Sequence, residues 1–500
     1  MNQRNLLTIA ATVFALTAVA QPNTMTGIKT YHGHYSEWMA NSVSTTAYWH
    51  YDVSLQAEAQ MDTWLAYPDD ATSKVKNAVN SYAGLVNSSG KISNGFWGTL
   101  GKVTELDNIR PGHFIMEYYN KVDGKESSKY TKACSSLLDN MGDMNRTLED
   151  YEYGPWEHKA SYPQQVWLDG IFMGLPFYTL AGPEINVDDA DMYFDDAASQ
   201  MHLTDSVTYD SETRLWKHAW DETKSMDWAT KNFNKPYAAK EASDKTSGRS
   251  AHTWGRALGW YAMACMEVLD NMEQFGVETS DSRYQTVLNL FQRIMASVVD
   301  YQDSTSGLWY DVMDVDKNDP DYASLSVKRQ NYLEATCSSM FTFSLLKGVR
   351  KGWLTNDGDR NYLSAGKKAY TGIVKTLLTT SGNNLQLTNC CEVGGLGGSK
   401  NRDGSYAYYM SENVKNNDPK GTGPFIWASL EAEQIGYDMA SNTFPEPVTA
   451  IQRVDNASKT AVSSEYFTVG GQRTSAHTRG LIIKRTHYSD GSTRVEKLKY

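Results

Sequence analysis

Residues 156–178 read WEHKASYPQQVWLDGIFMGLPFY, and the second half of this stretch has the continuous apolar character of a buried helix. Four residues that a buried helix seldom carries precede or open it: His158, Lys159, Trp167 and Asp169. Burying a carboxylate beside an imidazole, an ammonium group and an indole is costly unless these groups have a function. The set is typical of a pocket for a sugar acid, with an acid to move a proton, an aromatic wall and a cation for the carboxylate.

A helical pattern extends over most of the chain, from about residue 45 to residue 440. Apolar positions recur every three or four residues, and clusters of Gly, Asn, Asp and Ser interrupt them. The pattern predicts helices at residues 78–85, 113–122, 130–141, 167–178, 253–272, 284–301, 332–352, 366–378 and 424–438. Neighbouring segments pair into helical hairpins without a strict repeat, so a closed all-α toroid is favoured over an open solenoid.

Local signals place the two acidic candidates. Residues 161–164, SYPQ, match a capping box with proline in the first turn, which predicts that the helix carrying Asp169 begins there. Asp169 would then stand about two turns into the helix. Asp107 precedes the helix-start signal RPG at 110–112, so we expect it in a loop at the mouth of a helix.

The two ends of the chain differ from this helical region. Residues 1–20 combine a basic residue with a short apolar run and an A-x-A site, which predicts a signal peptide and export, to the periplasm or the cell surface. We expect the barrel domain at 21–440, a linker at 441–462 and a short β module at 463–500. The last segment resembles C-terminal modules of exported bacterial proteins, some of which are sorting signals; an inert extension is the alternative.

Composition narrows the functional classes. Aromatic residues make up 12% of the chain, with 14 Trp and 31 Tyr, and because aromatic faces stack on sugar rings we expect carbohydrate contact. The alternative is a helical core filled with aromatic residues. The net charge of −12 argues against nucleic acid or an anionic membrane as a partner. The five Cys show no zinc spacing, so we expect no metal and no cofactor; the oligomeric state stays open.

Two acidic stretches are interpreted as solvated loops. Residues 314–322, DVDKNDPDY, begin like a calcium loop, but Asp319 stands where glycine is needed and Leu325 where the bidentate Glu belongs. The stretch 188–196 has the same acidic character.

Further clusters carry groups suited to sugar-acid chemistry. Arg256 and Trp260 lie four residues apart and share a helix face, where they suit a planar carboxylate and a sugar ring. The alternative is an arginine in a helix–helix ion pair and a core tryptophan. His218 stands in HAWDETKSMDW and Tyr51 in WHYD. Singly, such residues are more often structural; their number in one chain favours a site.

Together these motifs resemble glycoside hydrolase family 105, the unsaturated rhamnogalacturonyl hydrolases. The resemblance covers about residues 48–438 and is carried by YPQQVWLDGIFMGLPFY, HAWDETKSMDW, HTWGRALGWYAMA, GLWYDVMD, NYLEATCSSMFTFSLLKGVRKGWL and GPFIWASLE. It implies an (α/α)6 barrel, so the predicted fold is all-α with a small C-terminal β-hairpin extension. It implies as substrates the disaccharides left by pectin lyases, with a 4,5-unsaturated galacturonic acid at the non-reducing end.

The family hydrates the double bond of this sugar rather than displacing the glycosidic bond directly. By resemblance, Asp169 is the proton donor, and Asp107 is a second acid that holds substrate or tunes Asp169. The resemblance also assigns a set of substrate-binding residues: Tyr51, His158, Lys159, Trp167, His218, Arg256 and Trp260. Because a proton donor must be protonated to act, we expect a mildly acidic pH optimum.

Two departures from the family leave the substrate open. Residues 232–248, NFNKPYAAKEASDKTSG, form a long insertion, and Asp311 stands where the family usually has Gln. A carboxylate at 311 would disfavour an anionic substrate if it faced the pocket. The alternatives are an unsaturated glucuronyl hydrolase for ulvan or glycosaminoglycan fragments, an inverting hydrolase with Asp107 and Asp169 as acid and base, and a non-catalytic glycan-binding protein.

Overall fold

The computed structural model describes residues 33–230, 247–316, 318–398 and 402–445, and four C-terminal segments at 461–468, 473–475, 481–488 and 493–499. The chain divides into two compact units, Met1–Phe444 and Pro445–Tyr500. The predicted signal peptide at 1–20 lies outside the described residues, as do most of the insertion at 232–248 and of the linker at 441–462.

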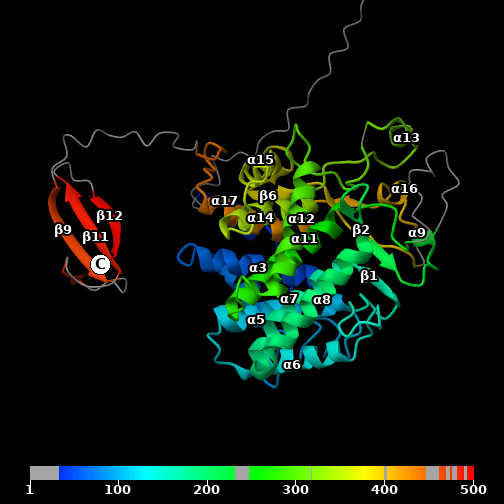
Figure 1. Cartoon of the computed structure of the whole chain (residues 1–500), viewed down its shortest axis with the longest axis horizontal. Helices are drawn as coiled ribbons and strands as arrows, with labels where there is room; N and C mark the ends of the chain where they lie inside the picture. The colour runs from blue at the N-terminus through cyan, green and yellow to red at the C-terminus, as the bar shows by residue number, and fades with distance from the viewer. Residues whose placement is uncertain are drawn as a thin grey trace, which may run out of the picture. The chain divides into compact units, whose positions relative to one another are not determined.

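In the part of the first unit that the structure describes, six helices pack into an inner ring, and Figure 1 labels each of them. They are α3 (Tyr51–Ala66), α5 (Pro111–Lys121), α7 (Leu168–Ile185), α11 (Gly255–Gln274), α14 (Ala335–Arg350) and α17 (Pro419–Gln434). Each packs against the next, and α17 packs against α3, so the ring is closed.

A second layer of helices covers this ring from outside. Its members are α2 (Tyr35–Ser42), α4 (Ser73–Ala83), α6 (Ser128–Gly142), α8 (Ala190–Thr208), α12 (Ser282–Asp300) and α15 (Tyr362–Thr376). In chain order they pack on α17, α3, α5, α7, α11 and α14. The predicted (α/α)6 barrel is therefore confirmed. None of the described helices has the length and apolar content that crossing a membrane requires.

Short elements connect the helices. The helical ones are η1 (Leu106–Asn108), η2 (Val187–Asp189), α9 (Asp227–Thr230), α13 (Pro320–Ala323) and α16 (Tyr406–Tyr409). Four antiparallel pairs are formed by β1 (Gln165–Trp167) with β4 (Ala219–Asp221), β2 (Tyr209–Asp210) with β3 (Leu215–Trp216), β5 (Leu378–Ser381) with β6 (Asn384–Leu387), and β7 (Cys390–Cys391) with β8 (Val414–Lys415). All five cysteines are buried free thiols.

All nine helices predicted from periodicity are present, with shifted ends, but the start of α7 was predicted wrongly. The helix begins at Leu168 rather than at residue 161, so Asp169 stands in its first turn. Gln164 has a positive φ of 56°, which a helix does not allow, and the next three residues pair with β4 as β1. Strand pairing with a distant segment therefore replaces the first two turns expected from the sequence.

The prediction of solvated loops is wrong for residues 188–196 and correct only in part for residues 314–322, where Asp316, Asn318 and Asp321 are exposed. Residues 188–196 contain the end of η2 and the beginning of α8, with Tyr193 and Phe194 buried among the acidic side chains. In the other stretch the side chain of Asp314 is only 5% exposed, and Lys217 donates to it at 2.7 Å.

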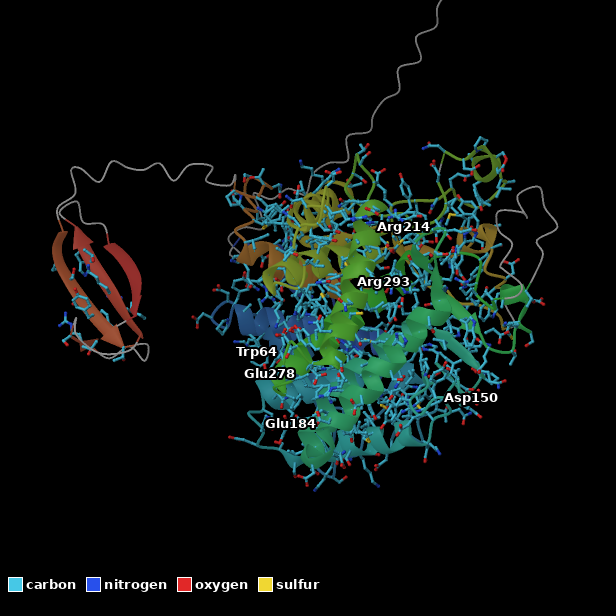
Figure 2. All side chains as sticks on the ribbon, in the orientation of Figure 1. Trp64, Asp150, Glu184, Arg214, Glu278 and Arg293 are labelled. Carbon is cyan, nitrogen blue, oxygen red and sulfur yellow. The ribbon has the colours of Figure 1, made fainter. Side chains whose placement is uncertain are left out.

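The inner helices run in one direction. Residues from the middle to the carboxyl end of α3, α11, α14 and α17, and from the length of α5, line a common cavity of about 280 Å³. Trp64, Glu184 and Glu278, at or just after the carboxyl ends of α3, α7 and α11, lie toward the left of the barrel in Figure 2. The strand β1, next to the amino end of α7, lies toward its right in Figure 1. The amino ends of the ring helices therefore meet at the opposite mouth.

A buried ion cluster ties the inner helices together inside the ring. Arg110, the N-cap of α5, is fully buried and donates to Glu267 at 2.7 and 3.3 Å and to Glu58 at 3.3 Å. Its guanidinium stacks on Phe172 of α7 at 4.3 Å, and His113 lies 3.1 Å from Glu58. Burial raises the pKa of Glu58 to about 7 despite the charge of Arg110.

We predict that Arg110→Met lowers the free energy of unfolding by about 3–5 kcal/mol at pH 8, because it leaves two buried carboxylates without their cation. The deficit should shrink as the pH falls towards about 7, because Arg110 lowers the pKa of Glu58 and the variant therefore takes up the proton at a higher pH than the wild type. Chemical denaturation at several pH values measures it. The control Arg214→Met removes an exposed ion pair with Asp300 and should cost less than about 1 kcal/mol; an equal cost for both variants contradicts the prediction.

The second unit contains a four-stranded antiparallel sheet in the order β10-β9-β11-β12. Its strands are β9 (Ala461–Thr468), β10 (Arg473–Thr474), β11 (Leu481–Tyr488) and β12 (Thr493–Lys499). The predicted hairpin corresponds to β11 and β12, and the structure extends it because β9 pairs along the other edge of β11.

Candidate active site

The pairing of β1 with β4 brings Asp169 to His218. Trp167 ends β1 and caps α7, and it pairs with Ala219, the neighbour of His218. The Nε2 atom of His218 lies 3.2 Å from Oδ2 of Asp169, and its Nδ1 atom lies 2.9 Å from Oη of Tyr409. The imidazole is fully buried, so its orientation toward Asp169 is held by the tyrosine behind it.

Asp107 lies on η1, in the turn before α5, as predicted. Nζ of Lys159 donates to its Oδ2 at 2.5 Å, and Nε2 of His158 lies 3.4 Å from its Oδ1. Burial favours the neutral acid, but the nearby charges of His158 and Lys159 prevail and hold the pKa of Asp107 below its usual value. Asp107 is therefore ionised near neutral pH and serves as an anion, paired with Lys159, rather than as a proton donor.

Trp167 belongs to a stack of rings along one side of the site. Its ring lies 5.1 Å from that of Tyr162 and 5.9 Å from that of His158, both nearly parallel, and it meets His218 edge-on at 5.1 Å. The indole Nε1 donates to Gln165 at 3.0 Å. The predicted aromatic wall is thus built from several rings; its contact with a sugar stays a prediction.

Arg256, in the first turn of α11, is held by backbone carbonyls and an indole. Its Nη1 donates to the carbonyl of Cys391 at 2.5 Å, and its guanidinium stacks on Trp254 at 4.3 Å. The N–H of Cys391 donates in turn to Glu334, the N-cap of α14, at 2.8 Å. The peptide of Cys391 is clamped on both sides, which fixes the position of the arginine.

Tyr51 and Trp260 lie at different depths in the barrel. Burial and the charge of Asp107 raise the pKa of Tyr51 well above its usual value, and the charge of Arg256 opposes this rise. Tyr51 therefore lies close enough to Asp107 and to Arg256 to feel the charge of each. Trp260 is only 1% exposed and stacks on Phe172 at 4.7 Å. It forms the floor beneath Tyr51, whose ring it meets edge-on at 6.4 Å; direct contact of Trp260 with substrate stays a prediction.

Asp311 is fully buried beneath the site. Nε1 of Trp254 donates to its Oδ1 at 3.0 Å. Burial, together with the charge of Glu334, raises the pKa of Asp311 to about 8, so the group carries a proton and no charge at neutral pH. It can therefore act there like the uncharged amide usual in the family.

We predict that Asp311→Asn stabilises the protein increasingly as the pH rises from about 4 to about 8. Over that range the unfolded chain has lost the proton that the folded chain retains, so the wild type loses stability with pH, and an amide removes this loss. Thermal unfolding of both proteins across the pH series measures the difference. Asp188→Asn, at an exposed site, should show no such trend; parallel curves for Asp311→Asn and the wild type contradict the prediction.

The predicted site residues converge at the mouth, but sequence reasoning missed two of their partners. Tyr409 orients His218 from 191 positions away and lies in a segment without a local signal. Trp254 contacts Arg256 and, at 4.9 Å between ring centres, His218. Its place directly before a helix start, two residues from Arg256, was the available signal.

Several buried polar atoms here have no hydrogen-bond partner within the described part of the chain, among them Nδ1 of His158, Oδ2 of Asp169 and Nε2 of His218 at the mouth and Oδ2 of Asp311 beneath it. Asp169 and His218 face each other at ion-pair distance without the alignment of a hydrogen bond. Because buried polar groups are normally paired, such a group of free atoms indicates a place for water or a ligand. The arrangement can exchange a proton with a bound polar molecule.

Comparisons with known proteins agree with this fold. Residues 24–435 match the model described as Glycosyl Hydrolase Family 88. Protein Atu3128 of Agrobacterium fabrum is 31% identical over 268 residues, which are 52% of this chain and 98% of that protein. Unsaturated rhamnogalacturonyl hydrolase YesR of Bacillus subtilis is 26% identical over 250 residues, 48% of this chain and 57% of that protein.

Solved structures with the same fold include a glycoside hydrolase from family 105 of C. acetobutylicum. It has a TM-score of 0.67 and 29% identity, over 80% of this chain and 99% of that one. A glycosyl hydrolase family 88 protein from Bacteroides vulgatus has a TM-score of 0.53 and 16% identity, over 82% and 98%, and shows the fold alone.

Proposed function

Because the chain belongs to Glycosyl Hydrolase Family 88, we propose that it removes a 4,5-unsaturated galacturonic acid from the non-reducing end of rhamnogalacturonan-derived disaccharides. The membership makes it a glycoside hydrolase of the group that acts on unsaturated uronates. The choice of rhamnogalacturonan is supported by the similarity to YesR and to the family 105 structure. We also propose that the protein is exported, on the strength of residues 1–20.

One observation carries the proposal: Asp169 and His218 face each other across 3.2 Å, each with a buried polar atom left unpaired. A carboxyl group in the first turn of a rigid helix is held in place for proton transfer. The paired and ionised Asp107 stands beside it as an anion rather than a second acid. This division of roles suits one proton donor better than an acid–base pair.

The proposed reaction is hydration of the double bond. Asp169 in its acid form donates a proton to C4 of the unsaturated ring, and a water molecule adds its oxygen to C5. The proton that this water loses returns to the carboxylate of Asp169. The hemiketal formed at C5 opens, and the glycosidic bond then breaks, so one water is consumed and the acid is restored.

The positive charge at the mouth supports binding of the uronate carboxylate. Lys159 and Arg256 stand there, and the amino ends of the ring helices add their partial positive charges. Both cations are already partly satisfied by protein oxygens, which fixes their position before substrate binds. A substrate anion therefore meets a prepared site rather than free side chains.

We predict that the purified protein removes the near-ultraviolet absorbance of an unsaturated rhamnogalacturonan disaccharide, while Asp169→Asn lowers turnover by at least about 10³-fold. The variant should bind the disaccharide within about tenfold of the wild-type Kd, since the amide keeps the size of the side chain. Calorimetric titration measures the binding. Near-normal turnover by Asp169→Asn contradicts the role of Asp169 as proton donor.

Parallel assays separate the alternatives. If absorbance is lost only with unsaturated ulvan or glycosaminoglycan disaccharides, the reaction is the proposed hydration but the substrate is an unsaturated glucuronide. Cleavage of a saturated disaccharide favours an inverting hydrolase. Binding without turnover of any of these sugars points to a glycan-binding protein.

We predict that Arg256→Ala raises the Kd of the unsaturated disaccharide at least about tenfold, because a charge facing the uronate is lost. The same disaccharide with its carboxylate reduced to an alcohol should bind both proteins alike. Arg293→Ala is the matched control, since Arg293 stacks on Tyr209 at 4.7 Å on the outer helix α12 (Figure 2). An equal loss of affinity for both ligands would show that Arg256 only shapes the site.

A further inference from the structure

An exposed aromatic turn stands beside the mouth and is not used by the proposed reaction. Residues 93–99, SNGFWGT, form a tight turn in which the N–H of Asn94 donates to the carbonyl of Gly98 at 2.6 Å. Phe96 is 62% exposed at its tip, and Trp97, at 84%, is the most exposed large hydrophobic side chain in the described residues. Neighbouring exposed aromatic side chains mark a binding surface more often than an accident of folding.

The turn packs closely against residues 47–49, which lead into the site. Gly95 has a φ of +94°, and a Cβ there would lie 2.8 Å from the carbonyl oxygen of Ala47 and from Cα of Tyr48. Only glycine permits so close an approach. The N–H of Trp49 donates to the carbonyl of Asn94 at 3.0 Å, so the turn is fixed rather than free.

The same segment connects the turn to the catalytic loop. The indole Nε1 of Trp49 donates at 2.9 Å to the carbonyl of Asn108, the residue after Asp107 on η1. One tryptophan therefore holds the aromatic turn through its backbone and the acidic turn through its side chain. The distance between the two is set by the fold.

A line of rings runs from the floor of the site to this turn. Ring centres are 6.4 Å apart for Trp260 and Tyr51, 4.7 Å for Tyr51 and His50, 5.8 Å for His50 and Tyr48, and 5.5 Å for Tyr48 and Phe96. Exposure rises along the line, from a buried floor to a solvent-facing tip. The line ends at Phe96, and Trp97 is the next residue in the turn.

We propose that Phe96 and Trp97 form an outer platform that stacks on a sugar ring of the leaving oligosaccharide, beyond the ring next to the cleaved bond. The inference rests on the proposed function and adds a preference for substrates longer than a disaccharide. Residues 93–100 carry no charged side chain, so the platform would hold the sugar by stacking rather than by an ion pair. The exposed faces of the two aromatic residues suit the apolar face of a pyranose.

We predict that Phe96→Ala/Trp97→Ala lowers, by about tenfold, the ratio of kcat/KM for the unsaturated tetrasaccharide to that for the disaccharide, through a raised KM for the longer sugar. Both substrates come from one lyase digest. The single variant Trp97→Phe should keep most of the wild-type ratio, because it retains an aromatic face at both positions. Leu65→Ala, a half-exposed hydrophobic residue at the carboxyl end of α3, is the control and should leave the ratio unchanged.

The proposal is overturned if the double variant loses kcat/KM equally for the tetrasaccharide and the disaccharide, or if the ratio of the two values does not change. If the wild type turns over neither sugar, the proposed function fails, and the platform is tested by binding alone. A saturated tetrasaccharide is then titrated into wild type and double variant while tryptophan fluorescence is followed. An unchanged Kd in the double variant overturns the platform in that case, and a Kd raised about tenfold supports it.

Discussion

The common direction of the ring helices is the constraint on which the site depends. Their amino ends carry partial positive charge, so the mouth attracts acidic groups of the protein as well as any anionic ligand. The protein's own acids are neutralised there: Asp107 by Lys159, Asp418 by Lys420 at 2.8 Å, and Asp311 by its proton. The field of the helices is thereby left for a bound anion, and Asp169 keeps an oxygen without a hydrogen-bond partner.

The fold was predictable from the sequence because the helices are long and amphipathic, and periodicity reports burial directly. The errors occur where contacts between distant segments override local signals. Residues 161–164 have the composition of a helix start, but β1 pairs with β4 more than fifty residues later, and α7 begins only after it. In α8 the acidic residues hid a helix whose apolar side chains are buried.

The candidate site was predictable as a set of residues, and its geometry was not. Asp169, His158 and Lys159 lie in one segment, so their composition alone signals a pocket. The orientation of His218 depends on Tyr409, and the charge state of Asp311 depends on burial beside Glu334. These effects arise from the closed ring and have no counterpart in a local pattern.

Ring closure also has a consequence for how the barrel folds. Ser36, near the start of the barrel, donates to Glu433 through its hydroxyl at 2.6 Å and its N–H at 3.0 Å, and α17 packs between α14 and α3. The ring of the first five helices is therefore incomplete until α17 packs between its two neighbours. This last ring helix also brings Lys420 and Asp418 to the mouth. A chain that ends before α17 has neither a sealed core nor a complete mouth, so the fold and the capacity for catalysis depend on the same last helix.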